Sequence, residues 1–449
     1  MRAQAFILLA VLLGPGQTRA GNLEKFFLGE DAGLTAGAVD ATTADSGSLY
    51  YNPAGLALLE RDSVDLGISA YAARYYRIPG VVQLNLPDRK STLDFTGTSF
   101  FSTPAAVIFG TRLGPNLGLG LGVFTRDQTD VAGIFSGKFE GPNGSGRYQY
   151  EQGVEIDFRA KDYLAGLGLG WQAAKPLRLG LSLLGEYTHQ SIGTQFWGDY
   201  LDPASYNPST QLYGTRLTTS FQQHLGVGSY GGRAIGGLQW QALPHWALGL
   251  VARSPDFVVY QSVESDALLD ANVAPGPIVV RIHINGDGTA HPYVWQDLWR
   301  LEGALAWTGA RGWVALQADA SDRPDDEGRG AVWNAKLGGL LHLNPTWDWG
   351  AGVYTDQAWN EAILSFGSSN LEYYGANTGL RWKRQIGATE GKPGAVELRT
   401  SLLLHYERGY GQLAGAGVDA QTVVFPLPIV KTAAIFEEAN VHLASSLAW

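Results

Sequence analysis

The sequence contains no cysteine among its 449 residues, and charged residues make up only 16% of it. Without cysteine there is no disulfide framework, no thiolate chemistry and no cysteine for lipid attachment. The net charge is −10 and no basic run occurs, so we expect no nucleic-acid partner. Fingerprints of hydrolases, zinc proteases, P-loops and dinucleotide sites are missing, so we predict no enzyme activity, cofactor or metal site. The eight histidines are scattered, although a catalytic set spread over barrel strands would leave no local motif.

Long hydrophobic runs are also missing beyond the start of the chain. Residues 1–20 combine Arg2, a nine-residue apolar core at Ala5–Leu13 and the small-residue end Thr18-Arg19-Ala20. This pattern predicts a secretory signal peptide, which is too short to span a bilayer. The longest uncharged span is 235–252, where Gln-Trp-Gln alternation and Pro244 predict two strands and a turn.

Strict period-two alternation recurs throughout the rest of the chain and predicts β-strands. In LRLGLSLLG (177–185), for example, alternate leucines fall on one face. A soluble sandwich and a membrane barrel both alternate in this way. Three features favour the barrel: segments of about 10–15 residues, alternating short and long connections, and aromatic residues at segment ends. These aromatic residues are Trp240, Trp246, Trp299, Trp307, Trp347, Trp349 and Trp382.

The connections predict the number of strands. Short turns are expected at 114–116, 175–176, 243–245, 309–311, 344–346 and 387–394, and long polar loops at 77–97, 128–159, 191–229, 262–295, 322–330, 358–370 and 408–432. Together they join fourteen antiparallel strands in an all-β transmembrane barrel at residues 63–449. The first strand is expected at 63–75. The last ends on Trp449, as is usual in outer-membrane barrels, and would be recognised by their assembly machinery.

Residues 21–62 precede the first strand and are rich in small residues and turn formers. They end in YYNPAGLALLE (50–60). A barrel of fourteen strands has a lumen wider than its own side chains can fill. We therefore predict that this segment is a plug inside the lumen.

The segment GEDAGLTAGAVDATTADSGSLYYNPAGLALLE resembles the N-terminal hatch of the FadL/TodX-type outer-membrane transporters of long-chain fatty acids and hydrocarbons. The matching motif is Asn52-Pro53-Ala54, followed by Gly55. Hairpins such as WQALPHWALGLVARSP, the strand count and the length extend the resemblance over the mature chain. It implies a hatch-closed monomer surrounded by outer-membrane lipid, with ligand capture by loops 191–229 and 262–295. It also implies lateral exit beside a kinked third strand.

The third predicted strand, from Leu117 to about Asp127, alternates leucine with Gly118, Gly120 and Gly122. Glycine weakens and bends strands and permits close backbone approach. These glycines therefore mark either a kink at a lateral opening or room for the hatch.

Charged residues are expected on the lumen face of many strands, where they would form a solvated or hatch-bracing network. The alternative is that some basic groups hold a ligand carboxylate, for which the candidates are Arg178, Arg253, Arg300, Lys336 and Arg399. Fatty-acid importers of this family tend to carry a basic residue on the upper fifth strand. Here residues 185–200 offer only His189, which leaves neutral hydrocarbons open.

The acidic stretch DRPDDEGRG (322–330) lacks the spacing of a calcium loop and is expected to be a solvated outer loop. The prediction is passive outer-membrane transport of hydrophobic small molecules. A passive porin and an adhesin that binds a partner through its outer loops are the alternatives.

Overall fold

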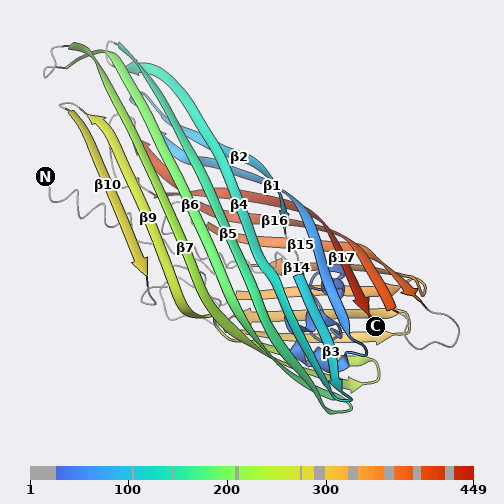
Figure 1. Ribbon diagram of the computed structural model, residues 1–449. Helices are drawn as coiled ribbons and strands as arrows, with labels where there is room; N and C mark the ends of the chain where they lie inside the picture. The colour runs from blue at the N-terminus through green and yellow to red at the C-terminus, as the bar shows by residue number, and fades with distance from the viewer. Residues whose placement is uncertain are drawn as a thin grey trace.

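The computed structural model describes residues 27–103, 106–143, 146–207, 212–273, 276–287, 299–321, 332–357, 369–387, 396–419 and 429–449. Three short helices precede seventeen strand segments (Figure 1). The helices are α2 (Glu30–Leu34), η1 (Ser46–Leu49) and η2 (Pro53–Leu58). The strands are β1 (Ser63–Asn85), β2 (Lys90–Thr103), β3 (Ala106–Gly114), β4 (Leu117–Asn143), β5 (Gly146–Ala174), β6 (Leu177–Asn207), β7 (Leu212–Leu243), β8 (Trp246–Arg253), β9 (Phe257–Val273), β10 (Gly276–Asp287), β11 (Arg300–Gly309), β12 (Gly312–Ser321), β13 (Val332–His342), β14 (Trp347–Asp356), β15 (Ser369–Ile386), β16 (Val396–Asp419) and β17 (Ile429–Ala448).

The seventeen segments form fourteen barrel strands, because three strands are each divided in two. Both β2 and β3 pair with β1, and both β8 and β9 pair with β7. On the next strand, β10 pairs with β9 and β11 pairs with β8. The ring closes where β1 pairs with β17, from Ser63↔Ala448 to Arg77↔Ile435. The predicted fourteen-stranded antiparallel barrel is confirmed.

The outward face carries an apolar band between two levels of exposed aromatic rings. On β7, Tyr230 and Trp240 are 53% and 45% exposed and mark the two edges of the band. Between these levels the outward residues are mostly aliphatic, such as Leu181 and Leu183 on β6. Aliphatic residues belong against lipid tails and aromatic rings against the two membrane interfaces. The band therefore identifies the membrane-spanning part.

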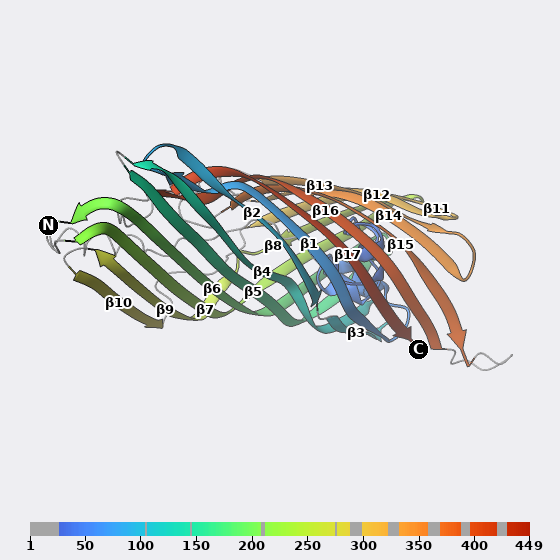
Figure 2. The same ribbon diagram turned by 90° about the horizontal axis from the view of Figure 1, so that it is seen from above.

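The wall has two very different heights. Strands β4 to β7 have 27, 29, 31 and 32 residues, whereas β11 to β14 have 10 or 11. The taller strands extend far beyond the rest on one side (Figures 1 and 2). The long loops predicted at 128–159 and 191–229 are therefore wrong, because the hairpins continue as strands above the membrane. Solvent replaces lipid there, so both faces tolerate polar residues and the hydropathy alternation disappears.

The other predicted turns and loops agree with the structure to different degrees. Five of the predicted short turns fall between consecutive strands, whereas the predicted turn 387–394 and the predicted loop 358–370 lie mostly outside the described residues. Much of 77–97, 262–295 and 408–432 is also strand rather than loop. The acidic stretch 322–330 lies outside the described residues, as do residues 1–20.

Residues 27–62 lie inside the barrel, near the end where the strands are joined by short turns (Figure 1). Lumen-facing glycines on opposite walls leave room for their backbone. A Cβ atom at Gly118 would overlap the Leu56 carbonyl, and one at Gly338 would overlap the Thr35 carbonyl. In the described residues no helix is both long and apolar enough to cross a membrane.

Candidate ligand channel

The Asn-Pro-Ala-Gly motif forms the start of a capped helix in the lumen. The side-chain oxygen of Asn52 accepts a hydrogen bond from Ala54 N at 3.1 Å, and Pro53 occupies the first turn of η2. The Asn52 amide nitrogen donates to Asp40 O at 2.8 Å and to Leu238 O of β7 at 3.0 Å. One side chain thus joins two turns of the N-terminal segment to the barrel wall.

Gly55 and the β4 glycines lie at close contacts within the N-terminal segment and between that segment and the barrel wall. A Cβ atom at Gly55 would overlap the Thr43 carbonyl. Gly120 lies against Leu56, and Gly122 against Leu49 and Ile108. The register irregularity of β4 lies farther along the strand, between Thr125 and Asp127. All three β4 glycines lie before it and contact the N-terminal segment or its neighbours.

Basic residues of the wall bind the N-terminal segment. Arg253 donates to Tyr50 O at 2.8 Å and stacks over the Tyr50 ring at 4.7 Å. Arg381 pairs with Glu30 at 3.5 Å and also with Asp31. These contacts are the bracing network that was one of the two alternatives for lumen-facing charge.

Above the N-terminal segment lies a set of buried ion pairs, here called the charged belt. It consists of five guanidinium groups and six carboxylates. On β4 to β7, Arg126 pairs with Asp162 and Glu186, and Arg233 pairs with Glu186 at 2.8 Å and Asp256 at 2.7 Å. The other pairs are Arg253–Glu302, Arg300–Asp319 and Arg74–Glu438. Every side chain of the belt is at most 9% exposed.

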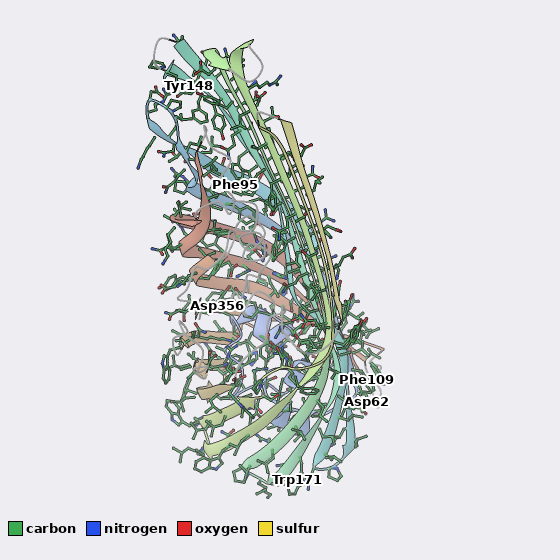
Figure 3. All side chains as sticks on the ribbon, turned by 90° about the vertical axis from the view of Figure 1, so that its left-hand side faces the viewer. Asp62, Phe95, Phe109, Tyr148, Trp171 and Asp356 are labelled. Carbon is green, nitrogen blue, oxygen red and sulfur yellow. The ribbon has the colours of Figure 1, made fainter. Side chains whose placement is uncertain are left out.

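Beyond the belt, a cluster of buried apolar side chains, here called the upper apolar lining, lies in the tall part of the barrel, together with buried polar side chains such as Gln152 and Gln190. Many of its members are rings in edge-to-face contact, such as Tyr76 and Phe436 at 5.0 Å and Phe95 and Phe135 at 5.3 Å. Figure 3 shows Tyr148 near the far end of the tall wall and Phe95 between it and the N-terminal segment. The buried members are Tyr76, Ile78, Val81, Val82, Leu84, Leu86, Leu93, Phe95, Phe135, Tyr148, Tyr150, Val154, Phe196, Tyr200, Leu371, Leu413, Ala416 and Ala434.

The backbone ladder is interrupted between β2 and β4, at a place called the β2–β4 seam. The β3–β4 ladder ends at Ala106↔Phe124, and β2 pairs only with β1 among the described strand residues. Phe124 faces Leu164, next to Tyr163 on β5. Above that level, side chains fill the seam, because Phe95 packs against the backbone of Gly133 and Leu93 against that of Gly137. The wall is therefore closed there by side chains alone.

The predicted ligand-contact residues do not form one site. Arg253 and Arg300 belong to the charged belt, and Lys336 is 2% exposed with Nζ near Gly37. Arg399 bonds Glu397 at 2.8 Å, and Arg178 is half-buried near the short turns.

His189 lies on the outward side of β6, because residues of odd number there, such as Leu181 and Leu183, point away from the lumen. From that side it cannot contact a ligand inside, so His189 is withdrawn as a candidate. Sequence reasoning missed Arg126, Arg233 and the seam. Arg126 follows an alternating strand directly, but only the register irregularity reveals that it turns inward beside Thr125.

The carboxyl groups of the N-terminal segment are held in an environment that disfavours charge. Burial raises the pKa of Glu30 to about 7, partly offset by Arg381, and raises the pKa of Asp45 to about 6. Burial also raises the pKa of Asp40 well above its ordinary value. Among the described residues, no group of three or more His, Asp or Glu side chains could hold a metal ion.

No protein-family model and no curated protein matches the sequence. Solved structures do. A FadL homologue from Pseudomonas aeruginosa matches with TM-score 0.59 and 12% identity, over 95% of this chain and 99% of that chain. The toluene transporter TodX from P. putida matches with TM-score 0.57 and 13% identity, over 95% and 99%. The monoaromatic hydrocarbon channel CymD matches with TM-score 0.55 and 14% identity, over 97% and 98%. The chain therefore has the fold of the FadL/TodX-type channels, as the resemblance predicted.

Proposed function

We propose that this protein lets hydrophobic small molecules diffuse across the outer membrane without catalysis. A ligand would enter over the upper apolar lining and leave sideways into lipid at the lower end of the β2–β4 seam, beside Phe124. The observation that carries the proposal is the seam. It begins above the Ala106↔Phe124 pair, next to the level of Tyr163 and Tyr230 at the aromatic edge of the apolar band, and it interrupts the ladder beside the upper apolar lining. Apolar molecules gain nothing from an aqueous pore but lose little along such walls.

In this proposal residues 27–62 act as a hatch that closes the straight route to the periplasm. Its support is the close fit at Gly118 and Gly338 on opposite walls and the bonds of Asn52. Residues 1–20 would direct export. β17, which ends beside Trp449, would be read by the assembly machinery, and the barrel would work as a monomer. The solved neighbours named above include transporters and channels for toluene and monoaromatic hydrocarbons, which agrees with a hydrophobic cargo.

The lateral route can be tested by closing the seam. Because the chain has no cysteine, the pair Phe95→Cys and Gly133→Cys can be joined by a short bifunctional thiol reagent. Linked protein should lose most hydrocarbon uptake, and cleavage of the linker should restore it. The matched control links Leu337→Cys to Val353→Cys, which already face each other in the β13–β14 ladder. Uptake that survives the seam linker would refute lateral exit.

A passive porin would behave differently in a planar bilayer. A barrel whose lumen holds residues 27–62 should be almost silent, whereas a porin should show steady conductance. Steady channels from the full chain would favour the porin over the transporter.

A further inference from the structure

The top of the β1–β2 hairpin, residues 79–95, is here called the mouth hairpin. We propose that it is a lid, closed in this structure, which fills part of the upper apolar lining until a ligand displaces it. The inference rests on the proposed function. Four features of the hairpin support it: its departure from the wall, the side on which it crosses the neighbouring strands, its two faces and the contacts at its tip.

The mouth hairpin leaves the barrel wall at Pro79. As far as Arg77, β1 pairs with its ring neighbour β17, but over 82–85 it runs parallel to β16. A parallel pair does not belong to the antiparallel ring, and β17 lies between the two strands, so the hairpin has to cross β17. The bend is at Gly80, whose φ of 63° favours glycine and whose amide donates to the Asp94 side chain at 2.8 Å.

The crossing takes place on the lumen side of the wall. Gly415 of β16 is two residues beyond Leu413 of the upper apolar lining, so both face the lumen. A Cβ atom at Gly415 would overlap the Val81 carbonyl, which places the hairpin backbone against the inner face of β16. On β17, the Thr432 hydroxyl donates to the Pro79 carbonyl. The mouth hairpin therefore folds over the lumen instead of extending the wall.

The mouth hairpin has one apolar and one polar face. It supplies six of the eighteen buried members of the upper apolar lining, namely Val81, Val82, Leu84, Leu86, Leu93 and Phe95. The exposed residues that alternate with them are polar, namely Gln83, Asn85, Thr92 and Asp94. The apolar face thus fills space beside the lining where a hydrophobic ligand would otherwise pack.

The tip of the mouth hairpin is fastened to the tall wall by hydrogen bonds. The buried Tyr148 hydroxyl of β5 donates to the Asp88 carboxylate, and Arg89 donates to the Glu140 carbonyl of β4 at 3.2 Å. Opening would break these bonds and expose the apolar face to water, so the lid stays closed at rest. A hydrophobic ligand that replaces the apolar face in the lining offsets that cost and favours the open state.

The first experiment locks the lid. Because the chain has no cysteine, Gln83→Cys can be joined by a short cleavable thiol reagent to Gly417→Cys, its neighbour in the β1–β16 ladder. The matched control joins Gln83→Cys to Thr92→Cys, which face each other within the hairpin and leave it free to swing. Uptake of labelled toluene and dodecane is measured in cells, with an empty-vector strain as background. The lock should lower uptake by about tenfold, and cleavage should restore it, whereas the control should not change it. Uptake that survives the lock would overturn the lid.

The second experiment measures opening without transport. A membrane-impermeant maleimide reports on Leu84→Cys, a position that is 2% exposed in the closed hairpin. Adding Tyr148→Phe keeps the ring and removes the bond to Asp88, so labelling should accelerate by about fivefold, the effect of one ordinary hydrogen bond. Adding Asp199→Asn instead breaks the exposed pair with Arg216 on the same wall and should leave the rate unchanged.

The two experiments separate failure of the lid from failure of the proposed function. If wild type takes up neither hydrocarbon above background, the proposed function fails, and the labelling rates alone decide whether the hairpin opens. Equal labelling in the Tyr148→Phe and Asp199→Asn backgrounds would refute the lid whatever the uptake. The migration shift between heated and unheated protein confirms that each variant is an assembled barrel.

Discussion

The lower and upper halves of the interior are built on opposite plans. In the lower half, residues 27–62 fit against glycines on several walls and are fixed by directed hydrogen bonds such as those of Asn52. In the upper half, rings face one another and one seam of the wall is closed only by side chains. Directed bonds and backbone contact specify one position, whereas apolar packing tolerates rearrangement. The proposed function, in which the barrel stays closed below and admits ligands above, requires both kinds of packing.

In the lower half, the largest displacement of the N-terminal segment should follow from adding a side chain at one glycine. Gly118→Val places a branched side chain where the Leu56 carbonyl lies, and backbone on both sides cannot yield. We expect the hatch to lose its position altogether. Its release is measured by labelling a thiol introduced as Ala32→Cys, which is 2% exposed in the docked segment. Gly114→Val at the end of the preceding strand is the control, since nothing lies within 4 Å of its Cβ position. Equal labelling of the two variants would contradict the close fit.

A smaller effect is expected from Asn52→Ala, which leaves the backbone in place. It removes the helix cap and two hydrogen bonds, a loss of about 1–3 kcal/mol in docking free energy. Hydrogen exchange of residues 30–60 should accelerate by roughly tenfold to a hundredfold, following that free energy. Asn344→Ala is the matched control, because Asn344 accepts the amides of Thr346 and Trp347 in an exposed turn away from the hatch. If both variants leave hatch exchange unchanged, the motif does not hold the segment.

A substitution in the upper half should change ligand transport and leave the docking of the hatch unchanged. Phe95→Ala removes the ring that packs on Gly133 across the seam, so hydrocarbon uptake should change severalfold while hatch exchange stays at the wild-type rate. The comparison variant is Phe257→Ala on β9, whose ring is 58% exposed. An altered hatch in Phe95→Ala, or equal uptake in both variants, would show that the two halves are not separate.

The two halves also differ in how far the sequence predicts them. Strand–turn–strand hairpins of the membrane part follow from alternation and from turns such as Asn344-Pro345-Thr346, because lipid imposes a regular apolar face. The tall wall cannot be predicted in this way, because β4 to β7 extend beyond the lipid and lose the alternation while they remain strands. The small residues of the N-terminal segment and the wide lumen of fourteen strands predict a plug, and Asn52-Pro53-Ala54 adds only a family resemblance. The partners of Arg126 and the seam depend on register between distant strands, which no local pattern encodes.

The smallest effect, and the one that links charge to the position of the hatch, is a dependence on pH. Burial raises the pKa of Glu30 from 4.5 to about 7, so the docked segment retains a proton that the released segment loses above pH 4.5. The contribution of Glu30 to docking is therefore complete below pH 4.5 and is lost as the pH rises through 7. Hydrogen exchange of residues 30–60 should accelerate by at most about tenfold per pH unit from this group, after correction for intrinsic exchange. Asp45, with a pKa of about 6, acts in the same direction, as does Asp40.

The difference in hydrogen exchange between wild type and Glu30→Gln isolates Glu30, because glutamine keeps the shape of the protonated carboxyl. That difference should grow between pH 5 and pH 7.5, with the variant exchanging more slowly at the upper end. Parallel profiles would mean that Arg381, 3.5 Å from Glu30, keeps the carboxylate charged throughout and that the hatch is not sensitive to protons at this position.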